Sequence, residues 1–373
     1  MKRFKLMTIL GTRPEIIRLA EIIKLADECY DHIIVHTGQN YDFQLNEIFF
    51  RDLGLRKPNH FLGVVGAHLG ETIGNVIARS YEVLAKENPD ALLVLGDTNS
   101  VLCTISAKRL KIPIFHMEAG NRCFDQNVPE EINRKISDHI SDINLTYTEH
   151  SRRYLLSEGF RKDHVFVTGS PLREVINRFL PSINESHILT NLGIESGKYI
   201  VVSAHREENI DLKDHFEILV KSINMVAEKY QMPVIFSTHP RTSKKIAEKG
   251  IVFNHLVQNV VPLGFFDYVK LQMSSFIVLS DSGTISEESA MLNFPAVSIR
   301  TSTERPEAID VGSIVLGGIQ SDEILNAIEI VKKTQSNSSI KLPPEYEVEN
   351  TSHRVIRIIK SYTPIVNKVI WDK

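Results

Sequence analysis

Charged side chains and histidines gather directly after short apolar runs of this chain, at the points where buried strands would end. They are the carboxylates Asp97, Glu118, Glu130 and Glu131, the arginines Arg13, Arg18, Arg122, Arg134, Arg206 and Arg305, and the histidines His116, His205 and His239. Taken singly, each has an ordinary explanation as a helix cap, a packed histidine or a surface ion pair. Bringing so many charges to one sheet edge is expensive without a charged ligand. The pattern therefore indicates a site built for a charged ligand.

The stretch FIVLSDSGTISEE at 276–288 indicates how such a site would be made. A buried strand at 276–280 would end in a tight turn, and a helix at 285–292 would follow. The turn exposes backbone N–H groups at the positive end of a helix, which suits a phosphate. The alternative is a capped strand–helix junction without a ligand, and this stretch alone does not separate the two.

Apolar runs alternate with helical patterns along the chain. Buried strands are predicted at 6–10, 32–36, 91–95, 112–115, 143–147, 164–168, 199–203, 233–237, 276–280 and 295–299. Helices are predicted at 14–26, 73–84, 129–140, 216–227, 285–292 and 352–362. Between 181 and 196 the periodicity weakens. The alternation predicts an α/β protein with parallel sheets, whose strands bind ligands at their carboxyl ends.

The two halves of the chain repeat one layout, because VLGDTNS at 94–100 and VLSDSGT at 278–284 both run from strand through turn to helix. We expect a Rossmann-like domain at 1–170 that carries the carboxylates. A second Rossmann-like domain is expected at 171–351. The segment 352–373 reads as a helix that could pack back on the first domain.

Composition excludes several classes of protein. A formal charge of −3 over 373 residues provides no basic field, so neither nucleic acid nor a membrane is an expected partner. Three separated cysteines fit no disulfide framework or zinc site, which favours a reducing, cytoplasmic compartment. No apolar run reaches the length of a membrane span. Metal-ligand spacings, the Walker loop, the dinucleotide G-x-G-x-x-G and the G-x-S-x-G elbow are all missing from the sequence.

Seven blocks in order resemble the non-hydrolysing UDP-N-acetylglucosamine 2-epimerases. They are GTRPE at 11–15, GDT at 96–98, EAG at 118–120, PEEINR at 129–134, AHREE at 204–208, DSGTISEE at 281–288 and TERPEA at 303–308. The resemblance implies a GT-B-type fold, in which two Rossmann-like domains with parallel sheets face a central cleft that holds UDP. It also suggests a homodimer.

The resemblance assigns roles to individual residues. The implied catalytic residues are Asp97, Glu118, Glu130 and His205. The implied substrate- and UDP-binding residues are Arg13, Arg18, Arg134, Arg206, Ser282, Gly283, Thr284, Glu288 and Arg305. Two positions depart from the family pattern: Arg18 stands where many members have lysine, and Thr284 stands where many have a second glycine.

Three further segments resemble the branch of the family that forms UDP-N-acetyl-L-fucosamine from UDP-2-acetamido-2,6-dideoxy-L-talose for capsule or O-antigen. They are HTGQNYD at 36–42, HMEAGNRCFDQ at 116–126 and DINLTY at 142–147. The implied route removes UDP from carbon 1 and a proton from carbon 2, and adds UDP back after reprotonation on the other face. It requires no redox cofactor and no metal. The alternatives are interconversion of UDP-GlcNAc and UDP-ManNAc, a hydrolysing epimerase, a GT-B glycosyltransferase and a non-catalytic UDP-sugar sensor.

Overall fold

The computed structural model describes residues 3–39, 43–204, 206, 213–238, 240–335 and 342–373. The chain divides into two compact units, which are Met1–Asn177 with Glu347–Lys373, and Arg178–Tyr346. The sequence places the first boundary after residue 170 and the return of the chain at 352. In the structure that boundary lies within a helix, α7 (Leu172–Asn184), and the chain re-enters unit 1 at Glu347.

Within the described residues, unit 1 contains a seven-stranded sheet whose strands all pair in parallel. In chain order the strands are β1 (Lys5–Leu10), β2 (Asp31–His36), β3 (His60–Phe61), β4 (Ala91–Leu95), β5 (Ile114–Met117), β6 (Ile143–Thr146) and β7 (Val165–Val167). Their order across the sheet is β3-β2-β1-β4-β5-β6-β7. Residues of β4 and its neighbours are almost wholly apolar and buried, as expected for strands covered on both faces.

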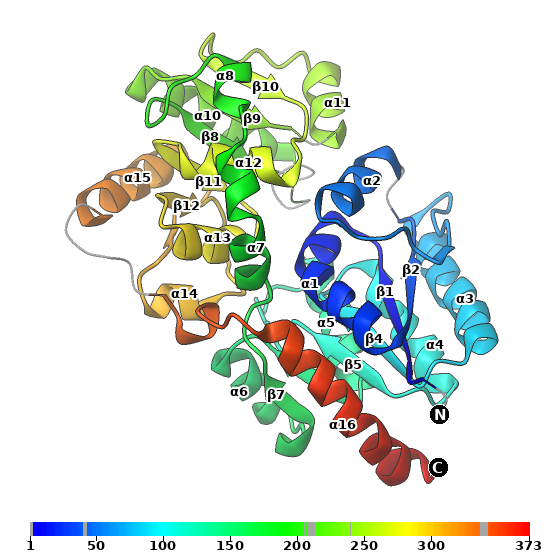
Figure 1. Ribbon diagram of the computed structural model, residues 1–373. Helices are drawn as coiled ribbons and strands as arrows, with labels where there is room; N and C mark the ends of the chain where they lie inside the picture. Colours follow the sequence, from blue (N-terminus) through cyan, green and yellow to red (C-terminus); the bar gives the residue numbers. More distant parts are fainter. Residues whose placement is uncertain (1–2, 40–42, 205, 207–212, 239, 336–341) are drawn as a thin grey trace. The chain divides into compact units, whose positions relative to one another are not determined.

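Helices cover the unit 1 sheet (Figure 1). They are α1 (Arg13–Cys29), α2 (Phe43–Asp52), α3 (Leu69–Glu87), α4 (Cys103–Arg109), α5 (Pro129–Ile140), α6 (Glu149–Ser157) and α16 (Thr351–Trp371), with 3₁₀ turns η1 (Asn99–Leu102) and η2 (Lys162–His164). The last helix, α16, packs beside α1, where the Tyr30 hydroxyl donates a hydrogen bond to the Ile356 carbonyl at 2.7 Å. Both ends of the chain therefore belong to unit 1.

Unit 2 repeats this architecture with six described strands, again all parallel. They are β8 (Ile200–Ser203), β9 (Val234–Ser237), β10 (Val257–Val260), β11 (Ile277–Ser280), β12 (Ala296–Ser298) and β13 (Val315–Leu316), in the order β10-β9-β8-β11-β12-β13. Its helices are α8 (Ile188–Leu192), α10 (Lys213–Tyr230), α11 (Pro240–Glu248), α12 (Phe265–Met273), α13 (Ile285–Leu292), α14 (Pro306–Asp310) and α15 (Ser321–Gln335), with the 3₁₀ turn η3 (Pro344–Tyr346).

Every strand predicted from an apolar run is present, with ends that differ by at most two residues. The largest shift is in β5, which starts at Ile114 instead of 112 because Lys111 adopts a left-handed conformation (φ 56°) and Pro113 has no N–H to donate. The strands that the sequence did not predict are β3, β10 and β13, which lie at sheet edges and are short or polar. The weak pattern at 181–196 also hides structure, because α7 continues through Pro181 and α8 follows it.

Both sheets have the strand order of doubly wound, Rossmann-like folds, which confirms the predicted α/β class. In such sheets the strand order reverses at one point, and ligands bind at the carboxyl ends of the two strands that flank it. These strands are β1 and β4 in unit 1, and β8 and β11 in unit 2. Among the described residues no helix is long and apolar enough to cross a membrane.

Candidate active site

Three turns at the carboxyl edge of the unit 1 sheet carry candidate residues. Arg13 follows β1, Asp97 follows β4 and Glu118 follows β5. The first two strands flank the point where the strand order reverses, and β5 is the next strand along. The parallel arrangement therefore brings these segments, which are far apart in the sequence, to one edge of the sheet.

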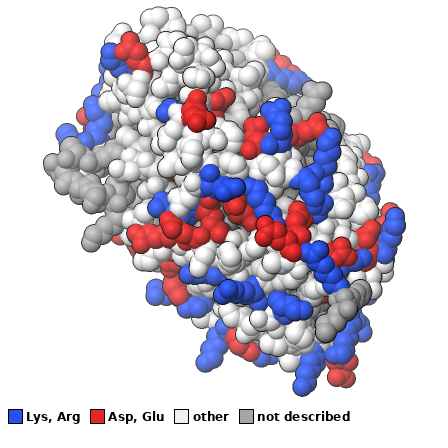
Figure 2. Space-filling model, in the orientation of Figure 1, with Lys and Arg blue, Asp and Glu red and all other residues white. Residues whose placement is uncertain are grey.

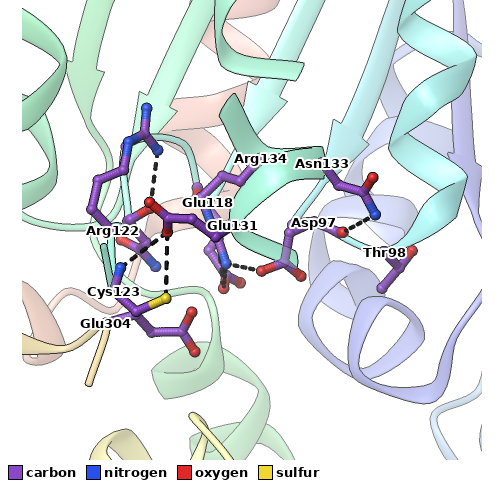
Figure 3. A network of polar contacts seen from close by, with 12 residues as sticks. Asp97, Thr98, Glu118, Arg122, Cys123, Glu131, Asn133, Arg134 and Glu304 are labelled. Carbon is purple, nitrogen blue, oxygen red and sulfur yellow. Dashed lines mark hydrogen bonds and ion pairs between the residues drawn. The ribbon is translucent and has the colours of Figure 1, made fainter. Parts of the chain in front are cut away.

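Arg134 on α5 is the centre of this edge, because its guanidinium contacts both carboxylates (Figure 3). It forms an ion pair with Asp97 and lies 3.4 Å from a Glu118 carboxylate oxygen. It also donates a hydrogen bond to the Glu118 main-chain carbonyl at 2.6 Å. The Arg134 side chain is 2% exposed, whereas those of Asp97 and Glu118 are 16% and 10% exposed. The carboxylates thus remain partly open to a substrate while the arginine is fixed beneath them.

A second arginine, Arg18 on α1, lies against Glu118, one of these two acids. Its Nε is 3.8 Å from Glu118, and its guanidinium lies 5.4 Å from the centre of the Tyr147 ring. Arg18 is buried, so the aromatic face and the carboxylate together replace its hydration. The charge that a lysine would supply here is present, but the planar group also packs on an aromatic ring.

Arg13 occupies the first position of α1, half-buried, with its guanidinium 5.8 Å from the Phe49 ring centre. Glu15 fixes this helix start. Its carboxylate accepts hydrogen bonds from the N–H groups of Gly11 and Thr12 at 2.9 and 2.6 Å, and from the Thr98 hydroxyl at 3.2 Å. Burial raises the pKa of Glu15 to about 7, although these donors oppose the shift. Glu15 therefore ties the turn before Arg13 to the turn after Asp97, a role beyond the helix-dipole effect that its position suggests.

The two glutamates of PEEINR have different surroundings. Glu130 lies half-buried on the first turn of α5. Glu131 is 3% exposed, accepts a hydrogen bond from the Cys123 N–H at 3.0 Å and pairs with Lys135 at 3.0 Å. Burial alone would raise the pKa of Glu131, but the Cys123 hydrogen bond and Lys135 hold it below its usual range. Glu131 thus fastens a loop, and Glu130 is the more accessible acid of the two.

Asn133 lies within the PEEINR block but was not among the site residues predicted from the sequence. Its amide donates a hydrogen bond to the Asp97 main-chain carbonyl at 3.0 Å and to Asn99 Oδ1 at 3.1 Å (Figure 3). It lies next to Arg134 on α5, so the same helix holds both the backbone and the side chain of Asp97. The sequence feature that could have indicated its role is its position in PEEINR, directly before Arg134.

In unit 2 the turn after β11 joins a buried strand to α13, as the sequence predicted. The Ser282 hydroxyl accepts a hydrogen bond from the Thr284 N–H at 3.3 Å, and α13 begins at Ile285. Thr284 has ordinary right-handed angles (φ −66°, ψ −27°), so a glycine is not required at that position. Gly283 is different, because a Cβ atom there would lie 2.4 Å from a Glu304 carboxylate oxygen. A side chain at position 283 would therefore displace the Glu304 carboxylate.

Glu304 joins two arginines beside this turn. Its Oε1 is 3.2 Å from Arg206 and 3.7 Å from Arg300, and it is 7% exposed. The Arg206 N–H also donates to Asp281 at 3.0 Å. Arg206 is therefore held next to the Ser282–Gly283 backbone, where a cation would complement a bound phosphate.

The last two predicted binding residues are engaged within unit 2. Glu288 accepts a hydrogen bond from the Gln272 amide at 2.8 Å and is half-buried. Arg305 is 2% exposed and forms a 3.1 Å ion pair with Glu287, which is fully buried. His205, together with Glu207 and Glu208, lies outside the described residues.

Charges elsewhere on the molecule are dispersed. On the face drawn in Figure 2, acidic and basic side chains are interspersed and neither sign forms a continuous field. Within the part of the chain that the structure describes, no three histidine, cysteine or acidic residues are grouped to hold a metal ion. The candidate site thus consists of local carboxylate–arginine contacts in each unit.

Comparison with known proteins identifies the group to which these sites belong. A family model described as UDP-N-acetylglucosamine 2-epimerase matches residues 24–360. A solved UDP-N-acetylglucosamine 2-epimerase from Rickettsia bellii is 45% identical, with full coverage of both chains and a TM-score of 0.92. The Methanocaldococcus jannaschii UDP-GlcNAc 2-epimerase, crystallised with UDP-GlcNAc and UDP, is 34% identical over 96% of this chain and 100% of that chain, with a TM-score of 0.89. A UDP-2,3-diacetamido-2,3-dideoxy-D-glucuronate 2-epimerase from Pseudomonas aeruginosa is 35% identical over 87% of this chain and 91% of its own length.

The two parallel sheets and their strand-edge residues define an enzyme of the GT-B-type fold, which confirms the fold implied by the sequence blocks. The matches also decide the family. The chain belongs to the UDP-N-acetylglucosamine 2-epimerase family, whose members are isomerases.

Proposed function

We propose that this enzyme inverts carbon 2 of a UDP-linked 2-acetamido sugar without net hydrolysis, by elimination and re-addition of UDP. The observation that carries the proposal is the pair of partly open carboxylates, Asp97 and Glu118, held on one buried guanidinium at the edge of the unit 1 sheet. Carbon 2 of such a sugar has no neighbouring carbonyl to acidify its hydrogen. The chemistry therefore needs a positioned base and a stabilised leaving group.

In the forward direction the bond between carbon 1 and the UDP oxygen breaks, and a carboxylate takes the proton from carbon 2. A carbon 1–carbon 2 double bond remains in a 2-acetamidoglycal. The second half returns a proton to the opposite face of carbon 2 and UDP to carbon 1, so atoms balance and nothing is oxidised. Asp97, Glu118 and Glu130 are the proposed proton-transfer groups, and His205 is a further candidate. Arg134 and Arg18 offset the charge of the acids.

The proposed UDP anchor is the turn of unit 2. Ser282, Gly283 and Thr284 would contact a phosphate at the start of α13 through the Gly283 N–H and the two hydroxyls, because the Ser282 and Thr284 N–H groups already donate within the turn. Arg206 would supply positive charge. Arg13 in unit 1 is a second proposed phosphate ligand. Glu288 is assigned to the ribose. Arg305 is buried against Glu287, so its proposed contribution to UDP binding is mainly to hold the residues of this site in place, and less to contact UDP directly.

The proposed substrate is UDP-2-acetamido-2,6-dideoxy-L-talose, with UDP-N-acetyl-L-fucosamine as product. The three segments at 36–42, 116–126 and 142–147 support this branch. The second candidate is interconversion of UDP-GlcNAc and UDP-ManNAc, which is supported by the names of several relatives and by the UDP-GlcNAc bound in one of them. A homodimer and a role in surface-polysaccharide synthesis accompany the first candidate as parts of the same proposal.

The test is to incubate the wild-type enzyme with each UDP-sugar in heavy water. Deuterium should appear at carbon 2, and the preferred substrate should be converted with the larger kcat/KM. Product formed without deuterium would exclude the proton-transfer route. Release of UDP and free sugar at the rate of turnover would instead indicate a hydrolysing enzyme, and UDP-sugar binding without exchange would indicate a sensor.

A further inference from the structure

A chain of buried polar residues lies directly behind the Asp97 and Glu118 turns and is not used by the reaction itself. It begins at His116 on β5, continues through Asp138 on α5 and Arg122, and ends at Glu158. The first three side chains are fully buried. Buried ion pairs are costly to form and are often replaceable by apolar side chains without loss of stability. Stability alone therefore does not explain why buried ion pairs lie behind these two turns.

His116 connects this chain to the Asp97 turn. Its Nε2 lies 2.7 Å from the main-chain oxygen of Gly96, and because a carbonyl only accepts, the imidazole donates this hydrogen bond. Its Nδ1 lies 2.9 Å from a carboxylate oxygen of Asp138. Both ring nitrogens thus face oxygen atoms, so the imidazole is held between the Gly96 carbonyl and the Asp138 carboxylate.

Asp138 connects the same chain to the Glu118 turn. Its two oxygens accept the Gly120 N–H at 3.2 and 3.3 Å, and one of them lies 2.7 Å from Arg122. Burial alone would raise the pKa of Asp138, but His116 and Arg122 hold it below its usual range. Arg122 is in turn fixed by two hydrogen bonds to Glu158, at 2.8 and 2.7 Å.

The anchored atoms are next to the reacting groups. Gly96 directly precedes Asp97, and Gly120 comes two residues after Glu118. Both turns have unusual backbones, with φ of 81° at Gly96 and 62° at Glu118, and the second value is disfavoured for a residue with a side chain. Such conformations persist only where the surroundings enforce them. Asp138 also lies one helical turn after Arg134, so α5 holds both the carboxylates and the backbone that carries them.

We propose that His116 and Asp138 are positioning residues for the epimerisation, which set the spacing of the Asp97 and Glu118 carboxylates across carbon 2. The inference rests on the proposed function, because that function places Asp97 and Glu118 among the proton-transfer groups. Proton transfer is sensitive to displacement of about 1 Å, which can cost on the order of a hundredfold in rate. UDP is assigned mainly to unit 2, so its binding should not depend on this pair.

Two substitutions at His116 separate the contacts. His116→Gln places an amide N–H near the position of Nε2 and can keep the bond to Gly96, whereas His116→Asn mimics Nδ1 and loses that bond. His164 provides the matched control, since it is also buried and its Nδ1 donates to a main-chain carbonyl, that of Asp142, at 2.9 Å. His164 lies at the amino end of β7, away from the carboxyl edge.

The measurements are kcat, KM and deuterium incorporation at carbon 2 with the preferred UDP-sugar, the Kd of UDP by calorimetry, and Tm. We expect His116→Asn to lower kcat at least tenfold with the Kd of UDP unchanged within about threefold. His116→Gln should recover most of kcat, and His164→Asn and His164→Gln should keep kcat within about twofold whatever their Tm. Should His116→Asn fail to fold, Asp138→Asn takes its place, with the same expected loss of kcat.

Wild-type kcat in a folded His116→Asn or Asp138→Asn enzyme would overturn the inference and leave the proposed function intact. An equal loss of kcat in the His116 and His164 variants would also overturn it, because the effect would then be general. A wild-type enzyme without exchange at carbon 2 would overturn both proposals.

Discussion

The two sheets have the same kind of strand order, but the side chains at the centres of their carboxyl edges carry opposite charge. In unit 1 a cation, Arg134, contacts two carboxylates, Asp97 and Glu118. In unit 2 a carboxylate, Glu304, contacts two guanidinium groups, Arg206 and Arg300. An edge rich in carboxylates suits proton transfer, and an edge rich in arginines beside a helix start suits a diphosphate. The comparison shows how one architecture accommodates two tasks through the sign of a few side chains.

The largest expected effect comes from removing the charge of an acid in unit 1. Asp97→Asn should lower kcat more than tenfold, because a positioned acid–base group typically contributes roughly 10²–10⁴-fold to the rate. The KM and the Kd of UDP should change little, because unit 2 is unaltered. Steady-state assays with circular dichroism test this, and Asp163→Asn, on the exposed side of the turn η2 in the same unit, is the control that should keep full activity. Near-normal turnover would remove Asp97 from the chemistry.

The second prediction concerns the stability of unit 2, which should fall when a buried ion pair is broken. Glu287→Gln leaves the Arg305 guanidinium buried without its charged partner, and loss of one partner of a buried pair costs about 3–5 kcal/mol. The denaturant midpoint of unit 2 should fall accordingly. Glu217→Gln, at a surface pair with Lys249, should leave the midpoint unchanged. A midpoint equal to that of the wild type would contradict this expectation. It would mean that Arg305 does not depend on Glu287, and a direct contact between Arg305 and the nucleotide would then be the better assignment.

The unit 1 edge should also depend on pH through Glu15. Its pKa rises from 4.5 to about 7 on folding because the carboxyl is buried, so the folded state binds the proton more tightly than the unfolded state. Stability is then greatest below about pH 4.5 for this group alone and is lost as pH rises through 7, by up to about 3 kcal/mol.

Glu15→Gln removes this titration. The difference in unfolding free energy between wild type and variant, measured from pH 5 to 8, should therefore move against the wild type as pH rises. A difference that is flat across this range would show that the hydrogen bonds donated to the Glu15 carboxylate outweigh its burial.

The smallest expected effect concerns the nucleotide turn. Gly283→Ala places a methyl group 2.4 Å from the Glu304 carboxylate, which must move and shift Arg206 with it. We expect KM to rise about tenfold, or about 1.4 kcal/mol of binding, with kcat nearly unchanged. Gly197→Ala, where a Cβ would meet nothing within 4 Å, tests whether added bulk alone matters, although its φ of 74° costs some stability. A fall in kcat with constant KM would contradict this prediction, because it would mean that Gly283 affects the chemical step and not the binding of the nucleotide.

The strands could be predicted where both faces are buried, because burial on both faces produces an unbroken apolar run, as in ALLVL of β4. The edge strand β10, VQNV, has no such run, and its extended form depends on pairing with β9, a long-range contact. Helix α7 was not predicted through Pro181 for a similar reason, since tertiary packing outweighs local preference.

The site shows the same division. That Asp97, Glu118 and Ser282 follow strands was readable from the sequence, since the carboxyl ends of parallel strands share an edge. That Arg134 contacts two acids, or that Arg305 is buried against Glu287, was not readable, because those contacts join segments whose spacing only the folded backbone determines. For the same reason the sequence indicated only a helix-dipole role for Glu15 and did not single out Asp138.

The return of α16 to unit 1 has a consequence for biosynthesis. Unit 2 is one continuous segment, Arg178–Tyr346, whereas unit 1 needs residues 347–373, which are translated after all of unit 2. Domains generally fold as units, in the order in which their residues emerge from the ribosome. Unit 2 can thus be completed before unit 1, whose Tyr30 hydroxyl awaits its acceptor at Ile356. A product truncated after residue 346 would therefore contain all residues of unit 2 but lack the last segment of unit 1.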